Sequence, residues 1–360
     1  MADEKQRQKQ KQEIPAMRGT FEIRGIVTSF DKVESYEKKT TTRKDMRKIV
    51  FDVTSSEGNI HRMQLQAFKS DKVYFSGRQK TETGEEKTVV KEVLWNDRLK
   101  FKEEGFAPID RVSFGLEKVK DEETGKESNK LETMFTFDAI EQIYKLLNVG
   151  ASIFVRGNIQ VEEYTAQNGE KRNATRFIPN QIYLTQEPID FNAEDFKERA
   201  LFELFAIAEE IEFTGTEEAT VTGLVIGNQR LGRQTLVFKN DPSLPENFSL
   251  STWMNALRNF QSAKPYIAAT FVGNIVNTAN TTESSVDETK VDEWGIPVTF
   301  HSPLRNRGNG FRREFICSGI VGESVDNETY TPENVDEFIS QFIKPKDEFG
   351  EVSSADDFAF

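Results

Sequence analysis

Two stretches of the chain share one order of apolar and polar positions. Residues 139–147 have apolar side chains at helical spacing, and a strand-like segment follows that ends in Val-Arg-Gly-Asn-Ile at residues 155–159. Residues 253–260 have the same helical spacing, and the strand-like segment after them ends in Val-Gly-Asn-Ile at residues 272–275. The spacing predicts a helix that leads into a strand at each place. The chain therefore contains an imperfect internal repeat.

The segments around each predicted helix extend the repeat. In the first copy, alternating patterns predict strands over 21–30 around Gly25, then over 48–54, 59–68 and 175–185. In the second copy they predict strands over 219–226 around Gly223, then over 234–239, 247–253 and 311–321. Three strands, a helix and two strands is the order of a five-stranded Greek-key barrel, the OB-fold. Glycines inside the first and fourth strands suit the sharp bends of a small barrel. We expect a mainly β chain with two OB-fold domains.

The rest of the chain surrounds these two barrels. We expect a disordered arm over residues 1–15, a first barrel over 16–190 with a β-rich insertion at about 69–135, and a second barrel over 214–322. Residues 191–213 are expected to form a linker helix, because five apolar residues fall on one helical face: Phe196, Ala200, Leu204, Ile207 and Ile211. Residues 323–360 are acidic, with little to bury, and are expected to form a disordered tail.

The composition narrows the chemistry. One cysteine and two histidines are too few, and too far apart, for a tetrahedral zinc site. His301 and Cys317 could form a nucleophile and base pair, but Cys317 lies in the apolar segment 315–320, where cysteine packs as a small hydrophobe. No phosphate-binding Gly-Lys loop is present. We therefore expect no enzyme activity, cofactor or metal.

The net charge of −13 is unevenly distributed. Residues 1–120 have 26 Lys and Arg against 20 Asp and Glu, whereas the last 40 residues have 2 against 11. A basic N-terminal region together with an acidic C-terminal end is typical of a nucleic-acid-binding surface joined to an acidic arm. No apolar run is long enough for a membrane span, and the first residues lack the apolar centre of a signal peptide. Together with the single cysteine, this favours a cytoplasmic protein, or one in the host cytoplasm if it is viral.

Basic and aromatic residues coincide with the loops that bind nucleic acid in an OB-fold, between strands one and two and between strands four and five. The candidates in and near the first loop are Tyr36, Lys38, Lys39, Arg43, Lys44 and Arg47. Those of the second loop are Tyr164, Lys171, Arg172 and Arg176. Cations would follow the phosphates and aromatic rings would stack on bases. The alternative for each loop is an ordinary solvated hairpin.

Further candidates lie in the insertion and in the second barrel. Tyr74 and Trp95 are candidate stacking residues, whereas Phe51 and Phe68 are expected in the core. In the second barrel the candidates are Arg230 and Arg233, in the loop expected between its first two strands, and Arg305 and Arg307. Arg305 and Arg307 form a glycine-spaced cationic segment with Arg312 and Arg313, which could bind phosphates or equally the acidic tail.

The chain closes on Asp356, Asp357, Phe358, Ala359 and Phe360. With two OB-like units and basic loops, this acidic, Phe-ended tip resembles single-stranded DNA-binding proteins, most of all the bacteriophage type. The resemblance implies that the tip docks on replication, recombination or repair proteins, and that the body binds single-stranded DNA without sequence preference. The chain departs from the cellular bacterial type, which has one OB-fold and forms tetramers, so a monomer is plausible. The alternatives are a virion structural or assembly protein and an RNA-binding OB-fold protein.

Overall fold

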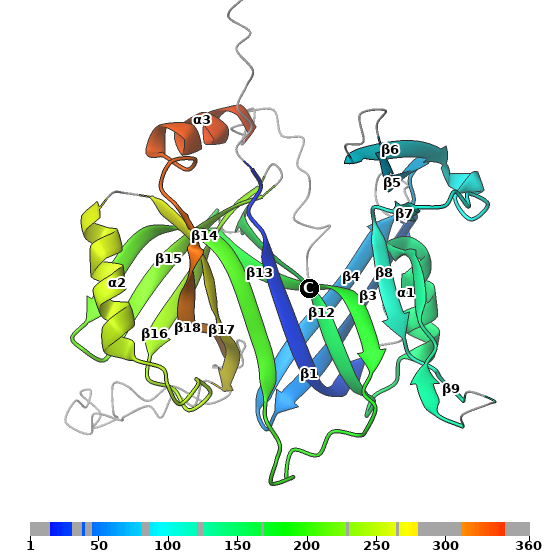
Figure 1. Cartoon of the computed structure of the whole chain (residues 1–360), viewed down its shortest axis with the longest axis horizontal. Coiled ribbons are helices and arrows are strands. Elements are labelled where there is room, and N and C mark those ends of the chain that lie inside the picture. The colour runs from blue at the N-terminus through cyan, green and yellow to red at the C-terminus, as the bar shows by residue number, and fades with distance from the viewer. Residues whose placement is uncertain are drawn as a thin grey trace, which may run out of the picture.

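The structure, a computed structural model, describes residues 15–30, 38–39, 45–80, 86–120, 122, 125–166, 169–227, 230–263, 266–279 and 311–342 (Figure 1). Strands dominate this part of the chain, so the expectation of a mainly β protein is confirmed. Eleven strands form one continuous path of pairing, and β12 and β2 complete the 13-stranded sheet that includes them.

The first half of the chain forms a sheet that closes on itself. Its strands are β1 (Gly19–Phe30), β3 (Asp45–Ser56), β4 (Asn59–Phe68), β12 (Ser152–Thr165) and β13 (Lys171–Leu184). β1 pairs with β3 and with β12, β3 pairs with β4, and β12 pairs with β13. A short parallel contact between β13 and β4, Phe177 opposite Met63, completes the ring. Helix α1 (Thr136–Leu146) lies between β4 and β12 in the chain.

The second half repeats this pairing order. Its strands are β14 (Arg199–Thr214), β15 (Glu218–Gly227), β16 (Arg230–Lys239), β17 (Ile267–Ala279) and β18 (Phe311–Asp326). β14 pairs with β15 and β17, β15 with β16, and β17 with β18, while β16 and β18 make the parallel contact. Helix α2 (Leu250–Ala263) takes the place of α1. We call the two closed sheets the first and the second barrel.

The expected linker helix over 191–213 is wrong, because most of this segment is strand β14. Ala200, Phe202 and Leu204 are buried while Leu201 and Glu203 are exposed, which is the two-residue alternation of a strand. The first strand of the second barrel is therefore β14, and the segment expected to be first, 219–226, is the second strand. The strand expected over 247–253 is also wrong, because α2 begins at Leu250.

Residues 69–135 lie along one side of the first barrel (Figure 1). β5 (Lys72–Lys80), β6 (Glu86–Leu94) and β7 (Phe106–Pro108) form a separate sheet that stands away from the barrel (Figure 1), and the short helix η1 (Trp95–Asp97) follows β6. β8 (Arg111–Gly115) pairs with β13 and with β11 (Glu132–Phe135). β9 (Lys118–Lys120) and β10 (Glu127–Asn129) form a hairpin, and β2 (Lys38–Lys39) pairs with β3.

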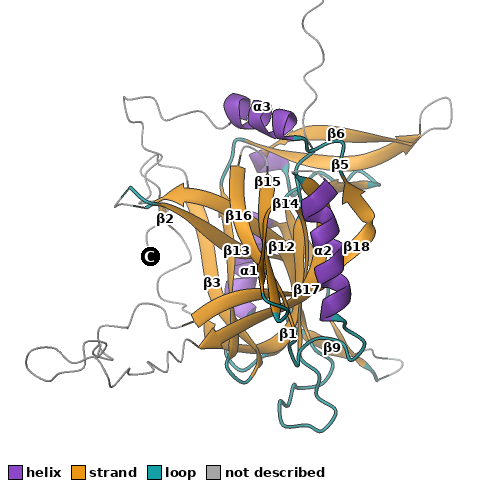
Figure 2. Ribbon diagram, turned by 90° about the vertical axis from the view of Figure 1, so that its left-hand side faces the viewer, coloured by secondary structure: helices purple, strands orange, loops and turns teal. Residues whose placement is uncertain are grey.

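Pairing of the two first strands joins the barrels. Residues 19–24 of β1 run antiparallel to residues 199–204 of β14, so backbone hydrogen bonds cross from one barrel to the other. The Asn59 side chain reinforces this junction, because its Oδ1 accepts a hydrogen bond from the Asn277 backbone N–H (2.8 Å) and its Nδ2 donates one to the Ile275 carbonyl oxygen (3.1 Å). Helix α3 (Pro332–Phe342) lies over one end of the second barrel (Figures 1 and 2).

The β12–β13 hairpin of the first barrel also packs against β16 of the second. A Cβ atom at Gly232 would lie 2.6 Å from the Glu162 backbone nitrogen, so there is no room for a side chain between these two strands. Across the same contact, the Thr175 hydroxyl donates a hydrogen bond to Gln234 Oε1 (2.6 Å), and Asn173 Oδ1 accepts one from the Arg233 backbone N–H (2.9 Å).

We predict that Gly232→Ala lowers the free energy of unfolding by about 1–3 kcal/mol, because the new methyl group forces two backbones apart. Gly322→Ala is the matched control, since a Cβ atom at Gly322, also in the second barrel, meets nothing within 4 Å. The measurement is chemical denaturation of both variants and the unmodified protein. Equal stability of the two variants would contradict the close approach.

A buried polar group, His61, lies on β4 near the junction. Its Nε2 is 2.9 Å from the Ser55 hydroxyl oxygen, and that hydroxyl donates a hydrogen bond to Glu198 Oε1 (2.6 Å). Burial, and secondarily the charge of Arg313, lowers the pKa of His61 from 6.5 to about 3. The imidazole therefore stays neutral in the folded protein at pH values where the unfolded chain binds a proton.

Because the pKa of His61 is lower in the folded protein than in the unfolded chain, the free energy of unfolding depends on pH. The contribution of neutral His61 is present in full above its unfolded pKa of 6.5 and is lost as the pH falls toward 3. We predict that stability declines over this window by up to about 1.4 kcal/mol per pH unit through this group. The free energy of unfolding of His61→Gln should decline less steeply as the pH falls. Denaturation of both proteins at several pH values gives the difference between them, and the carboxylates cancel in this difference because both proteins contain them. Parallel curves would contradict the buried neutral imidazole.

Candidate nucleic-acid interface

The outer face of β3 and β4 presents polar and apolar side chains to solvent. Opposite pairs on this face are Met46 with Phe68, Lys48 with Gln66, Val50 with Gln64, and Asp52 with Arg62. Phe68 is 45% exposed, and the Arg62 side chain is 67% exposed and makes a long contact with Asp52 (3.8 Å). We call these eight residues the β3–β4 face. It combines an exposed ring, cationic groups, one carboxylate and amide side chains on one side of two paired strands.

The expectation for Phe68 is wrong and that for Phe51 is confirmed. Phe51 is buried in the first barrel with Met63, which is its pairing partner on β4. Phe68 projects to the other side, because it is an odd number of residues from Met63 along the strand. The alternation of Met63, Leu65 and Ala67 in the sequence already contains this information.

Two candidates close to the β3–β4 face belong to the core instead. The Arg47 guanidinium donates a hydrogen bond to the Phe137 carbonyl oxygen (2.9 Å), lies 4.1 Å from the Phe137 ring centroid, and pairs with Glu141 (3.1 Å). Trp95 is 9% exposed, its ring packs edge-on against Phe137 (5.2 Å), and Arg98 covers it. Both side chains fasten α1 to the barrel and the insertion, so neither offers a surface for stacking or for phosphates.

The exposed aromatic candidates are Tyr74 and Tyr164. Tyr74, on β5, is 48% exposed, and its hydroxyl contacts Glu92 Oε2 only at 3.5 Å. Tyr164 lies near the end of the β12–β13 hairpin and is also exposed. Each has a ring that solvent reaches.

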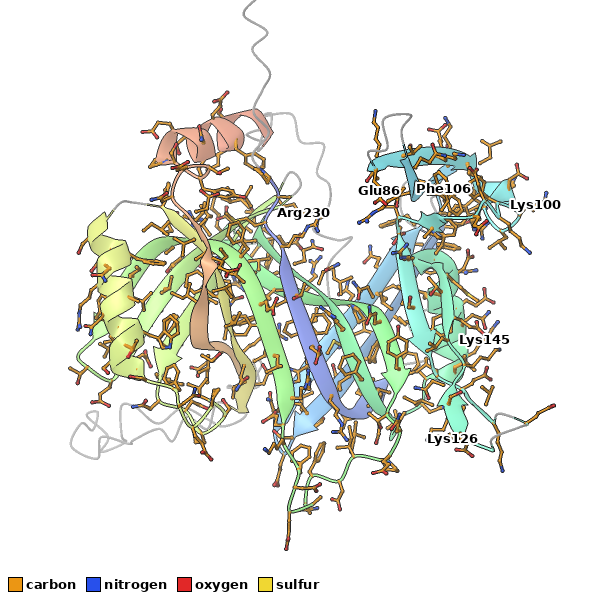
Figure 3. All side chains as sticks on the ribbon, in the orientation of Figure 1. Glu86, Lys100, Phe106, Lys126, Lys145 and Arg230 are labelled. Atoms are coloured by element: carbon orange, nitrogen blue, oxygen red, sulfur yellow. The ribbon has the colours of Figure 1, made fainter. Side chains whose placement is uncertain are left out.

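The structure brings together five basic candidates from both barrels, although the sequence assigned them to separate loops. Arg230 (Figure 3) and Arg233 lie on β16, the third strand of the second barrel, and not in a loop between its first and second strands as expected. They meet the β12–β13 hairpin, where acidic residues pair with the cations. The ion pairs are Lys171–Glu163 (2.8 Å), Arg172–Glu170 (2.9 Å), Arg176–Glu162 (2.8 Å), Arg230–Glu162 (3.0 Å), Arg233–Glu163 (3.3 Å) and Arg233–Glu209 (2.6 Å). Within this group the charges are nearly balanced.

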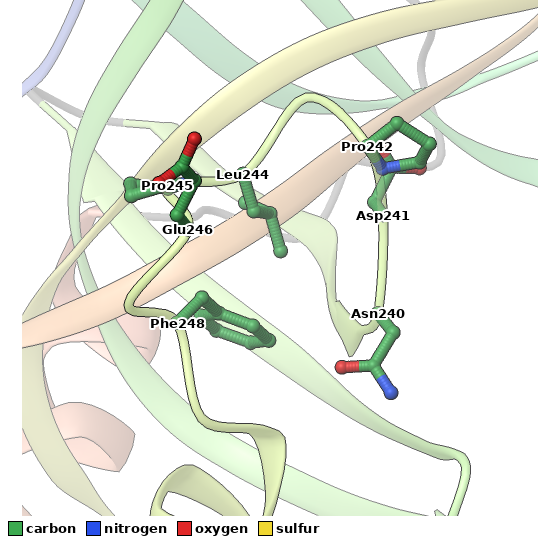
Figure 4. Close-up of a pocket in the computed structure, with 7 residues that line it drawn as sticks. All are labelled: Asn240, Asp241, Pro242, Leu244, Pro245, Glu246 and Phe248. Carbon is green, nitrogen blue, oxygen red and sulfur yellow. The ribbon is translucent and has the colours of Figure 1, made fainter.

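A polar pocket of about 490 Å³ lies beside this group, where the barrels meet. β13 supplies Asn173 and Thr175, and the second barrel supplies the rest of the lining: Thr222, Arg233, Gln234, Thr235, Val237, Arg313 and Glu314. A second pocket, of about 370 Å³, lies within the 240–248 loop (Figure 4). Asp241 and Glu246 line that loop pocket, so it is poorly suited to an anion.

The remaining candidates lie outside the described residues. They are Tyr36, Arg43, Lys44, Arg305, Arg307, and the tip Asp356, Asp357, Phe358, Ala359 and Phe360. Lys38 and Lys39 are described only as the backbone of β2. The prediction for all of these residues therefore stays a prediction.

The described residues also bear on other types of site. Within them, no group of three or more His, Cys, Asp or Glu side chains is placed to hold a metal ion. Cys317 is fully buried, and burial raises the pKa of its thiol, which disfavours the reactive thiolate. None of the helices in the described ranges is long and apolar enough to cross a membrane.

The fold and the site define a mainly β protein with two closed sheets and an exposed, partly cationic β-face. The chain belongs to the YorF family, which it matches over residues 18–351. No curated protein matches it. Among solved structures, the single-stranded DNA-binding protein of Thermus aquaticus is similar at 12% identity. A deletion mutant of that protein gives a TM-score of 0.32, with 73% of this chain and 88% of that one covered, and the wild type gives 0.33, with 73% and 86% covered.

Proposed function

We propose that this protein is a non-enzymatic, sequence-tolerant binder of single-stranded DNA, and that both barrels are OB-folds. The observation that carries the proposal is the β3–β4 face. It lies on the second and third strands of a sheet whose pairing order is that of an OB-fold, and OB-folds bind oligonucleotides across these two strands.

The side chains on this face suit a single strand better than a duplex. The exposed Phe68 ring offers a stacking surface for an unpaired base, which is worth about 1–3 kcal/mol per base. Arg62 lies on the same face and is free to reach a phosphate, because its contact with Asp52 is long and solvent-exposed. Stacking and phosphate contacts do not read base edges, so binding would tolerate any sequence.

The proposed biological role adds the acidic tail to this surface. The body would protect replication and recombination intermediates in the cytoplasm, and Asp356, Asp357 and Phe360 would recruit replication, recombination or repair proteins. The charge distribution supports this division of roles, since the basic excess is in residues 1–120 and the acidic excess is in the last 40 residues.

We predict that the protein binds oligo-dT more tightly than a duplex of equal length, with an affinity that falls as salt rises. Phe68→Ala should weaken binding to oligo-dT by about 5- to 150-fold, because it removes one stacking ring. Leu131→Ala, which truncates another exposed apolar side chain, is the control and should leave affinity unchanged. Fluorescence anisotropy with labelled oligonucleotides measures all three proteins.

Four outcomes of such titrations would count against the proposal. An equal affinity for duplex and single strand, or an affinity insensitive to salt, would overturn single-strand binding. A preference for oligo-U over oligo-dT would favour the RNA-binding alternative. Absence of any nucleic-acid binding would favour a virion structural or assembly protein.

We predict that deletion of residues 358–360 leaves the affinity for oligo-dT equal or higher while abolishing the capture of partner proteins. The deletion removes both phenyl rings but none of the cations of the barrels. Affinity capture from a cell extract with the full chain and with the deleted chain, followed by identification of the bound proteins, provides the comparison. Capture of the same replication or repair proteins by both chains would refute the role of the tip.

A further inference from the structure

Arg313, on β18, is a partly buried cation with an incomplete set of partners. Its Nη1 donates a hydrogen bond to the Thr175 carbonyl oxygen (3.0 Å), and its guanidinium lies 4.5 Å from the Phe177 ring centroid. The Nε atom is buried and has no hydrogen-bond partner. No carboxylate among the described residues pairs with Arg313. Burial lowers the pKa of this guanidinium to about 10, so it remains charged near neutral pH.

A charge that is partly withdrawn from water without a counterion is costly, because the protein replaces little of the hydration that the charge loses. The interactions that Arg313 does have compensate poorly, since a carbonyl oxygen and a ring face carry only partial charge. An arginine in this position therefore favours an anion beside it. The polar pocket between the barrels is the space that such an anion would enter, because Arg313 lines it.

The other charged groups of the pocket already have partners. Arg233 donates two hydrogen bonds to the Glu209 carboxylate (2.6 and 2.8 Å). Glu314, the acid that lines the pocket, pairs with Lys239 (2.6 Å). Arg313 thus supplies the uncompensated charge of the pocket. The hydroxyl groups of Thr222 and Thr235 lie in the same lining, and hydroxyls can donate hydrogen bonds to an anion's oxygen atoms.

The position of the pocket indicates which anion it receives. β13 contacts β4 within the first barrel and supplies Asn173 and Thr175 to the pocket. Thr222 on β15 and Thr235 on β16 are paired on the second and third strands of the second barrel. The pocket therefore lies where β13 of the first barrel meets the second and third strands of the second barrel.

We propose that this pocket is a phosphate subsite, in which Arg313 binds a backbone phosphate of the single strand as the strand passes from the first barrel to the second. This inference rests on the proposed function and adds a specific contact to it. Arginine suits the task because its planar fork of donors matches phosphate oxygens and carries a permanent charge. The two barrels would then form one continuous binding path.

The test compares Arg313→Gln, Arg313→Lys and the unmodified full chain in titrations with oligo-dT at several salt concentrations. We expect Arg313→Gln to weaken binding by about tenfold, as for the loss of one charged hydrogen bond. The slope of log affinity against log salt should become shallower by about 0.7, the value for one phosphate contact on a single strand. Arg313→Lys should keep the slope, because it keeps the charge, and lose part of the affinity.

Two controls separate this contact from a loss of structure. Arg258→Gln removes an exposed arginine from α2, which does not line the pocket, and should change neither affinity nor slope. Thermal unfolding of each variant shows whether the fold is intact. If Arg313→Gln unfolds, the salt slope of Arg313→Lys decides the question, because a slope shallower than that of the unmodified protein would overturn the proposal.

The remaining outcomes distinguish this inference from the proposed function. Equal affinity and equal slope for Arg313→Gln and the unmodified protein would overturn the subsite while leaving single-strand binding intact. No binding of oligo-dT by the unmodified protein would overturn both. If inorganic phosphate raises the melting temperature of the unmodified protein but not of Arg313→Gln, while both bind oligo-dT equally, the pocket takes free phosphate and not the DNA backbone.

Discussion

The antiparallel pairing of β1 with β14 is the constraint on which the arrangement of the two barrels depends. Each of these strands already takes part in its own closed sheet, and their shared segment adds backbone hydrogen bonds between the halves. Because such bonds require a fixed register, the barrels have little freedom to rotate against each other. The contact of the β12–β13 hairpin with β16 and the Asn59 hydrogen bonds follow from this register.

This rigid junction explains why charged residues from distant parts of the sequence meet. Glu162 on β12 contacts both Arg176 on β13 and Arg230 on β16, and Glu163 contacts Lys171 and Arg233. The basic candidates of the β12–β13 hairpin and of β16 are thus engaged in ion pairs, two of which, Arg230–Glu162 and Arg233–Glu163, cross between the barrels. Arg62 on the β3–β4 face and Arg313 in the pocket have no close carboxylate partner among the described residues, so a ligand could use their charge.

The sequence predicted the mainly β class and the repeated order of strands and helices. It could not assign a segment as helix or strand where the apolar residues fit the spacing of both. Ala200, Leu204 and Ile207 fit a helical face, and Ala200, Phe202 and Leu204 fit a strand equally well. The strand forms because β1, far away in the chain, supplies hydrogen bonds. Likewise, no local pattern shows that Trp95 and Arg47 meet at Phe137, or that Arg313 is enclosed by the other barrel.

The shared strand edge has a further consequence for dissecting this protein. A fragment that contained only the first barrel would leave one edge of residues 19–24 of β1 without β14, and a fragment that contained only the second would leave one edge of residues 199–204 without β1. Unpaired edges of this kind recruit other strands and promote aggregation. Two copies of such a fragment could pair through β1 and reproduce the antiparallel junction of the intact chain. A homodimer of a single barrel would then preserve the geometry that the full chain achieves by repetition.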